Sequence, residues 1–196
     1  MGGRPRTGGF TLMELMIVVA IVGILASLAV FMFTRHVAKA KASEVPAMFA
    51  ELKLRQQQFH LENEEYLSTG ADDTAAFPSV SPPGSSPQSY DLGTSAVPPL
   101  PQGTKYPDPS WRTLRVSPDK TQLYCVYVAI AGPGGDDTNV GPKATGGPFN
   151  LGGALAIPAV NWFYLMAQCD FDGDGDTSTY FTLSDTEGTI VSNPGE

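Results

Sequence analysis

The chain has 196 residues, of which 16% are charged, and its net charge is −8. A chain of this length holds one ordinary domain with its own core and is too short for a multidomain enzyme. Its 21 glycines and 17 prolines, together about 19% of the residues, indicate a folded protein rich in loops. The negative charge repels phosphate backbones, so we expect no specific nucleic-acid partner.

The N-terminal region is the most apolar part of the chain, since no residue from Leu15 to Phe33 is charged. A helix over this run would be about 28 Å long, close to the thickness of a bilayer's hydrocarbon core. A buried core helix is a poor alternative, because helices of soluble proteins are rarely apolar on every side. A secretory signal peptide has a shorter apolar stretch, and a plain membrane anchor does not explain Glu14 at the start of the run.

A specific motif lies at the start of this run, directly after a short basic segment. Its sequence is Gly8-Gly9-Phe10-Thr11-Leu12-Met13-Glu14-Leu15-Met16. The motif closely resembles the class III leader and N-terminal helix of type IV pilins and the related pseudopilins. The resemblance implies that residues 1–9 are a leader, that a prepilin peptidase cuts between Gly9 and Phe10, and that the new Phe10 amine is methylated. It also implies a precursor in the bacterial inner membrane, which the pilus assembly machinery adds to an extracellular filament of identical subunits.

Glu14 would be the fifth residue of the cleaved chain, and an unpaired carboxylate in lipid is costly. Cleavage creates a cationic amine at Phe10. In a bundle of parallel helices offset along their axes, the amine of one subunit can pair with Glu14 of its neighbour and so set the register of the bundle. We therefore expect Phe10 and Glu14 to direct assembly, and residues 10–34 to form a helix that first crosses the membrane and later lies in the filament core.

Apolar residues continue to recur at helical spacing after this segment, and they predict an amphipathic stem helix over residues 35–67. Pro46 is expected to kink this stem unless Ser43 caps a fresh helix start. Many pilins carry a helix-loosening proline at the position that Phe31 holds here. We assign the flexibility of the helix to Gly23 and Pro46 instead.

Residues 68–110 are dense in proline and serine, which predicts a long surface loop of the kind that varies among pilins. Residues 111–196 predict an antiparallel sheet, because β-branched and aromatic runs alternate with Gly, Pro and Asp clusters. The expected strands are 111–116, 122–130, 161–169, 179–183 and 189–191. The predicted fold class is α+β, the type IV pilin fold, with the stem helix on one face of the sheet and loops on the other.

Cys125 and Cys169 are the only cysteines. In an exported protein such a pair indicates a disulfide, which would stabilise the fold by about 4 kcal/mol on the chain-entropy model. Two buried free thiols are the alternative.

Four aspartates, Asp170, Asp172, Asp174 and Asp176, lie at alternate positions with Gly175 at the turn, and this resembles the first half of an EF-hand calcium loop. The twelfth position holds Phe181 in place of glutamate, so a complete EF-hand is excluded. Either other oxygens complete a Ca²⁺ site, as in some pseudopilins, or the segment is a polar hairpin turn. No other cofactor is expected.

No catalytic constellation is visible, since His36 and His60 are isolated and the sequence holds no phosphate loop. We therefore expect no enzyme, but a pilus subunit that serves adhesion, motility or DNA uptake. A pseudopilin of a type II secretion system is the alternative with the same processing and helix-mediated assembly. A membrane-anchored, calcium-binding surface module that does not polymerise is the alternative of another class.

Overall fold

The computed structural model describes residues 10–70, 76–78, 82–89, 110–116, 122–135, 159–186 and 188–192. The chain divides into two compact units, Met1–Lys39 and Ala40–Glu196, and each is described by itself. The expected leader with Gly9, and most of the expected loop at 68–110, lie outside the described residues.

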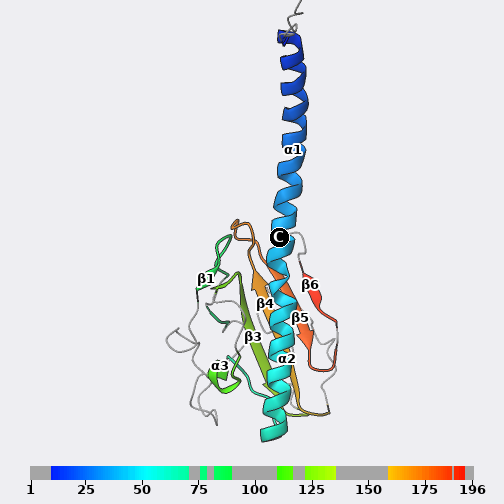
Figure 1. Ribbon diagram of the computed structural model, residues 1–196. Helices are drawn as coiled ribbons and strands as arrows, with labels where there is room; N and C mark the ends of the chain where they lie inside the picture. The colour runs from blue at the N-terminus through cyan, green and yellow to red at the C-terminus, as the bar shows by residue number, and fades with distance from the viewer. Residues whose placement is uncertain are drawn as a thin grey trace, which may run out of the picture. The chain divides into compact units, whose positions relative to one another are not determined.

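Helix α1 runs from Leu12 to Ala42 and contains the uncharged run (Figure 1). Among the described ranges, the helical run Leu12–Asn63 is the only one that is long and apolar enough to cross a membrane by length and composition. This run contains both α1 and the helix that follows it.

Helix α2 runs from Glu44 to Asn63, so a single residue, Ser43, lies between the two helices. Ser43 keeps helical backbone angles, with φ −64° and ψ −13°, and its hydroxyl donates to the Ala40 carbonyl at 2.6 Å. A new helix therefore starts directly after Ser43, as in the alternative to a kink at Pro46, but the Ser43 side chain makes no capping hydrogen bond. Pro46 lies in the first turn of α2, where a missing N–H is tolerated because that N–H has no helical partner.

The stem helix ends four residues before its predicted end at Leu67. Glu64 adopts the left-handed conformation with φ 61°, and its N–H donates to the His60 carbonyl at 2.8 Å. The chain then folds back onto the helix. The buried side chain of Gln56 accepts the Leu67 N–H at 3.0 Å and donates to the Leu67 carbonyl at 2.5 Å.

The main sheet has four antiparallel strands that lie in chain order: β3 (Cys125–Gly132), β4 (Trp162–Cys169), β5 (Ser178–Leu183) and β6 (Ile190–Ser192). A second sheet pairs β1 (Gln88–Ser89) with β2 (Gln122–Leu123). The strands predicted at 161–169, 179–183 and 189–191 are confirmed to within one residue at each end. The predicted α+β class is also confirmed.

Two predicted strands need correction. The run 122–130 is divided at Tyr124 into β2 and β3, and β3 extends to Gly132. Residues 111–116 form no strand; the short helix α3 (Ser110–Thr113) stands there, and Arg115 ends the segment with a left-handed φ of 53°. The buried residues Trp111 and Leu114 lie three apart, as across one helical turn, and only Leu114 and Val116 keep the two-residue spacing of a strand.

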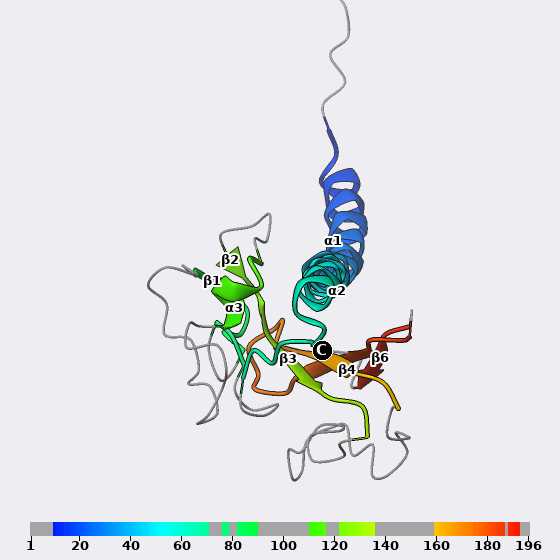
Figure 2. The same ribbon diagram turned by 90° about the horizontal axis from the view of Figure 1, so that it is seen from below.

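Both faces of the main sheet are covered with apolar side chains. Figure 2 shows α2 lying over one face, and α2 contacts β3 and β4. On this side the buried residues of α2 include Val45, Met48, Phe49, Leu52 and Phe59. The opposite face carries a separate buried cluster of Val128, Ile130, Trp162, Tyr164, Met166 and Phe181. Most of the residues between β3 and β4 lie outside the described residues.

The outer edge of β3 is paired with the chain's own loop segments. Phe77 and Tyr127 exchange two backbone hydrogen bonds of 2.7 and 2.8 Å. The Thr69 N–H donates to the Ala129 carbonyl at 2.7 Å, and the Thr69 hydroxyl accepts the Ala129 N–H at 2.8 Å. The backbone groups of this edge are therefore satisfied within the chain.

Candidate functional site

The start of α1 is closed by a reciprocal cap between Thr11 and Glu14. The Glu14 carboxylate accepts the Thr11 N–H and the Thr11 hydroxyl, both at 2.9 Å, and the Thr11 hydroxyl in turn accepts the Glu14 N–H at 3.2 Å. This is a capping box, in which Thr precedes the helix and Glu is its third residue. Glu14 thus has a partner inside its own chain as well as the partner expected in a neighbouring subunit.

The described side chains in the apolar part of α1 are exposed. Every described side chain from Phe10 to Arg35 is exposed, including Leu12 at 80% and Phe33 at 67%. Apolar surface of this extent gains free energy when it leaves water. The helix is therefore built to be covered by lipid or by other protein chains.

Two positions in the middle of α1 bear on its flexibility. The Ser27 hydroxyl donates to the carbonyls of Gly23 and Ile24, both at 2.9 Å, so it is satisfied within the helix. A methyl group placed at Gly23 would meet no atom within 4 Å, so no close contact in the described unit requires glycine there. The expected flexibility at Gly23 and Pro46 stays a prediction.

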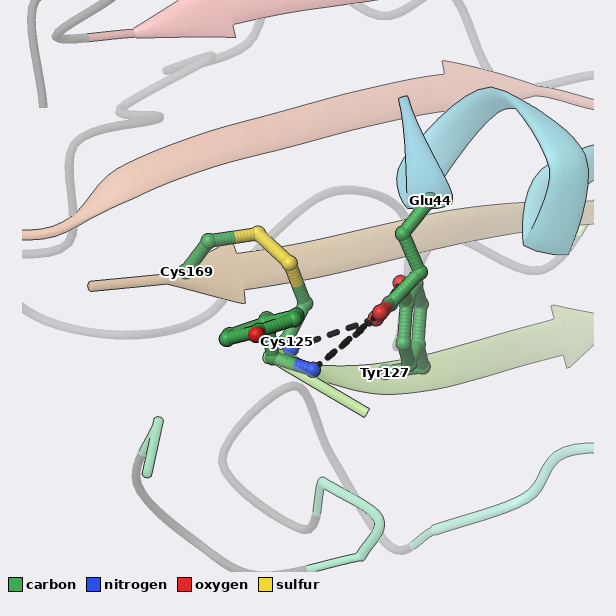
Figure 3. Close-up of a disulfide and its surroundings, with 5 residues drawn as sticks. Glu44, Cys125, Tyr127 and Cys169 are labelled. Carbon is green, nitrogen blue, oxygen red and sulfur yellow. Dashed lines mark hydrogen bonds between the residues drawn. A yellow bond between two sulfur atoms is a disulfide. The ribbon is translucent and has the colours of Figure 1, made fainter. Parts of the chain in front are cut away.

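The first residue of α2 supplies a buried carboxylate that holds the beginning of β3 (Figure 3). Glu44 is 5% exposed. It accepts the backbone N–H groups of Tyr124 at 3.2 Å and Cys125 at 3.3 Å, and the phenol of Tyr127 at 2.8 Å. The break at Tyr124 between β2 and β3 leaves these N–H groups free to face the carboxylate. A buried carboxylate is tolerated when its oxygens are satisfied in this way.

Lys41 lies one helical turn before Glu44 and contacts two other segments of the same unit. Its ammonium donates to the carbonyls of Ser85 at 2.9 Å and Phe171 at 2.8 Å. It also lies 4.9 Å from the centre of the Tyr124 ring, which is a cation–π contact.

The predicted disulfide between Cys125 and Cys169 is confirmed. The two cysteines lie directly opposite each other in the register of β3 and β4, and both are fully buried. Cys125 and Tyr127 are two residues apart and share one face of the sheet, and Tyr127 packs against Phe49 of α2. The disulfide therefore lies on the face that α2 covers.

The aspartate loop brings three of its four predicted calcium ligands together. Carboxylate oxygens of Asp170, Asp172 and Asp174 lie within 4.8 Å of one another, whereas Asp176 is not part of this group. Asp170 is buried, and its oxygens already accept the N–H groups of Gly173 at 2.6 Å and Gly175 at 3.3 Å. The donor set suits a hard cation such as Ca²⁺ in its chemistry, but it supplies fewer than the six to eight oxygens that calcium takes.

Sequence reasoning missed the roles of Thr11, Lys41 and Glu44, although signals for two of them are visible. The pattern Thr11-x-x-Glu14 before an apolar run is that of a capping box. Glu44 stands in the buried stripe of α2 beside Val45 and Met48, and a charge in such a stripe predicts a buried partner. Nothing in the sequence indicates the partners of Lys41, which come from segments far along the chain.

Comparison with known proteins finds a family model that matches the N-terminal region and several proteins similar to part of the chain. The family described as "Prokaryotic N-terminal methylation motif" matches residues 4–30. The chain is similar to the type IV major pilin protein PilA of Myxococcus xanthus, with 47% identity over 63 residues, which is 32% of this chain and 29% of the relative. It is also similar to two proteins of Dichelobacter nodosus. A probable minor fimbrial protein is 38% identical over 33% of this chain and 41% of its own length, and a type IV major fimbrial protein FimA is 49% identical over 24% and 29%.

These matches cover less than half of the relatives' own length. No solved structure matches the chain. The α+β architecture, a long N-terminal helix followed by an antiparallel sheet, is consistent with the type IV pilin fold. The methylation motif at the capped start of α1 and the similarity to curated pilin and fimbrial proteins both support a relationship to type IV pilins.

Proposed function

We propose that the protein is the structural subunit of a type IV pilus. In this proposal a prepilin peptidase removes residues 1–9 and the new amine of Phe10 is methylated. Helix α1 holds the precursor in the bacterial inner membrane. The assembly machinery then joins identical copies into an extracellular filament that serves adhesion, motility or DNA uptake.

The observation that carries this proposal is the all-round exposure of α1 from Phe10 to Arg35. Burial of one large apolar side chain is worth roughly 1.5–3 kcal/mol, so a helix of this kind favours lipid first and other copies of itself in a filament. The names of the similar proteins, a type IV major pilin and two fimbrial proteins, agree with this reading.

The capping box suggests how Glu14 is accommodated at both stages. In the precursor, Thr11 supplies the carboxylate with two donors from its own chain. In the filament, the ammonium of Phe10 from a neighbouring subunit supplies the opposite charge, without which a carboxylate buried away from water is costly. The pair then fixes the axial offset between subunits.

The proposal is tested by shearing filaments from the surface of the native cells and determining the N-terminus and intact mass of their main component. We expect this chain, beginning at N-methylated Phe10. A chain that begins at Phe10 but is absent from surface filaments would indicate a pseudopilin of a type II secretion system. An intact Met1, or a cut near Ala29, would overturn the proposal in favour of an anchored surface module that does not polymerise.

The proposed subunit needs no cofactor for assembly. Calcium at Asp170, Asp172 and Asp174 stays a prediction, supported by the proximity of three carboxylates.

A further inference from the structure

A buried carboxylate accompanies each cysteine of the disulfide, one through a hydrogen bond and one as the next residue in the chain. Glu44 accepts the backbone N–H of Cys125, and Asp170 directly follows Cys169 and is 7% exposed. Each carboxylate is held by backbone N–H groups of its own surroundings. The two sulfur-bearing residues are fully buried in this polar setting.

The beginning of α2 and the residue one turn before it reach both ends of this disulfide. Glu44 bonds to Tyr124, Cys125 and Tyr127, which lie at and beside the first cysteine. Lys41 donates to the carbonyl of Phe171, two residues after the second cysteine. Lys41 and Glu44 therefore attach this turn of helix to chain segments that lie next to each of the two cysteines.

We propose that Lys41 and Glu44 form a lock over the Cys125–Cys169 disulfide, so that a reductant reaches the sulfurs only when this turn of helix lifts from the sheet. A thiolate must approach a sulfur directly to break the bond, and neither cysteine is accessible in the closed arrangement. Opening of the turn therefore sets the rate of reduction.

This inference does not depend on polymerisation, and it concerns the unit Ala40–Glu196 alone. It differs from simple stabilisation, because the lock controls a local opening at one end of the sheet. A variant that weakens the fold elsewhere should therefore leave the local opening largely unchanged.

The test measures the reduction of the full chain in detergent micelles by dithiothreitol. One thiolate of the reagent attacks a cysteine sulfur and forms a mixed disulfide, and its second thiol closes a ring and releases the other cysteine. The reagent is oxidised by two electrons and the cysteine pair is reduced by two. Free thiols are alkylated at set times and counted by mass.

We expect Glu44→Gln to speed reduction by about ten-fold or more, because the neutral amide offers one acceptor oxygen in place of two charged ones and so holds the Tyr124 and Cys125 N–H groups more weakly. Tyr127→Phe, which removes one donor and keeps the ring, should give a smaller rise. Lys53→Met is the matched control. Lys53 donates to the Thr182 hydroxyl at 2.9 Å and the Thr186 carbonyl at 2.6 Å, so its loss weakens α2 at another part of the sheet.

Reduction of Glu44→Gln no faster than Lys53→Met would overturn the proposal. If Glu44→Gln does not fold, the reduction rate of Tyr127→Phe tests the proposal. A rate equal to that of the unmodified protein would overturn the proposal. Amide hydrogen exchange gives a second measurement. The N–H groups of Tyr124 and Cys125 should exchange faster in Glu44→Gln and in Tyr127→Phe, and their exchange should be unchanged in Lys53→Met.

Discussion

The phenol of Tyr127 donates a 2.8 Å hydrogen bond to the buried carboxylate of Glu44. The bond joins the first turn of α2 to the third residue of β3, and Tyr127 is itself fully buried. Burial raises the pKa of Tyr127 well above its usual value of 10.0, and the negative charge of Glu44 raises it further. The residue thus links helix packing to the protonation of the phenol.

Replacing Tyr127 by Phe should lower the free energy of unfolding by about 1.5–3 kcal/mol, the usual contribution of a hydrogen bond to a charged group. Urea unfolding of the full chain in detergent at neutral pH would measure the change. A loss below a few tenths of a kcal/mol would show that the bond contributes little.

The same pair predicts an alkaline loss of stability. Because the pKa of Tyr127 is higher in the folded than in the unfolded chain, the folded state keeps a proton that the unfolded state loses. This contribution is full below about pH 10 and falls as the pH rises above it. Unfolding followed between pH 8 and 11 should show a steeper alkaline decline than in Tyr127→Phe, and parallel curves would contradict the prediction.

Glu14→Ala should abolish filament formation, because the variant lacks the charge that pairs with a neighbouring Phe10 amine. Thr11→Ala removes the hydroxyl of the capping box but keeps the Glu14 carboxylate, and it should cost about 1 kcal/mol of helix stability while filaments still form at reduced yield. Sheared surface protein from both variants would be compared with unmodified cells. Normal filaments from Glu14→Ala would refute the pairing.

Replacing both cysteines by Ala should lower the free energy of unfolding by about 4 kcal/mol, since the crosslink closes a loop with a sequence separation of 44 residues. Circular dichroism should still report the sheet, because the buried clusters on its two faces do not depend on the crosslink. Chemical denaturation of the variant beside the unmodified chain is the measurement.

Calcium should raise the thermal midpoint of the full chain if it binds the aspartate loop. A ligand at one hundred times its dissociation constant adds about 2.7 kcal/mol, and chelation by EDTA should remove that gain. Asp172→Asn combined with Asp174→Asn should abolish the response at little cost without metal, since both side chains are exposed.

Asp170→Asn should behave differently from the other two aspartates. Its buried carboxylate accepts the N–H groups of Gly173 and Gly175, so the variant should be less stable even in EDTA. Equal midpoints with calcium and with EDTA in the unmodified chain would leave the loop as a polar turn.

Two leucines of α2 offer a matched test of the helix–sheet packing. Leu52 is fully buried and Leu54 is 49% exposed. Leu52→Ala should lower the free energy of unfolding by about 2–5 kcal/mol, and Leu54→Ala should change it by no more than about 0.5 kcal/mol. Similar losses in the two variants would mean that α2 does not pack as described.

The long helix and three of the strands could be predicted from the sequence alone, because each follows from a local pattern of residues. The run from Leu15 to Phe33 is apolar throughout, and the strands at 162–169 and 178–183 alternate with clear turn residues. The cysteine pair was predictable for a similar reason, since only one pairing exists.

Elements that depend on distant contacts were not predictable. The run 122–130 is divided into two strands at Tyr124, whose N–H donates to the Glu44 carboxylate, 80 residues away in sequence. The short helix at Trp111 was mistaken for a strand because its residues favour β-structure, and tertiary burial at a spacing of three overrode that preference. The attachment of Lys41 to Ser85 and Phe171 likewise exists only once the fold has formed.

The pairing of β3 with Phe77 and Thr69 has a consequence for crowded surroundings. A bare strand edge is a template onto which the same strand of another molecule can add, and such additions lead to aggregation. Here the long edge is occupied by the chain's own backbone, and the other edge of the described sheet, β6, has only three residues. When molecules are held side by side at high density, hydrogen bonding between the strand edges of neighbouring sheets is therefore disfavoured. Contacts between such molecules are then made by side chains.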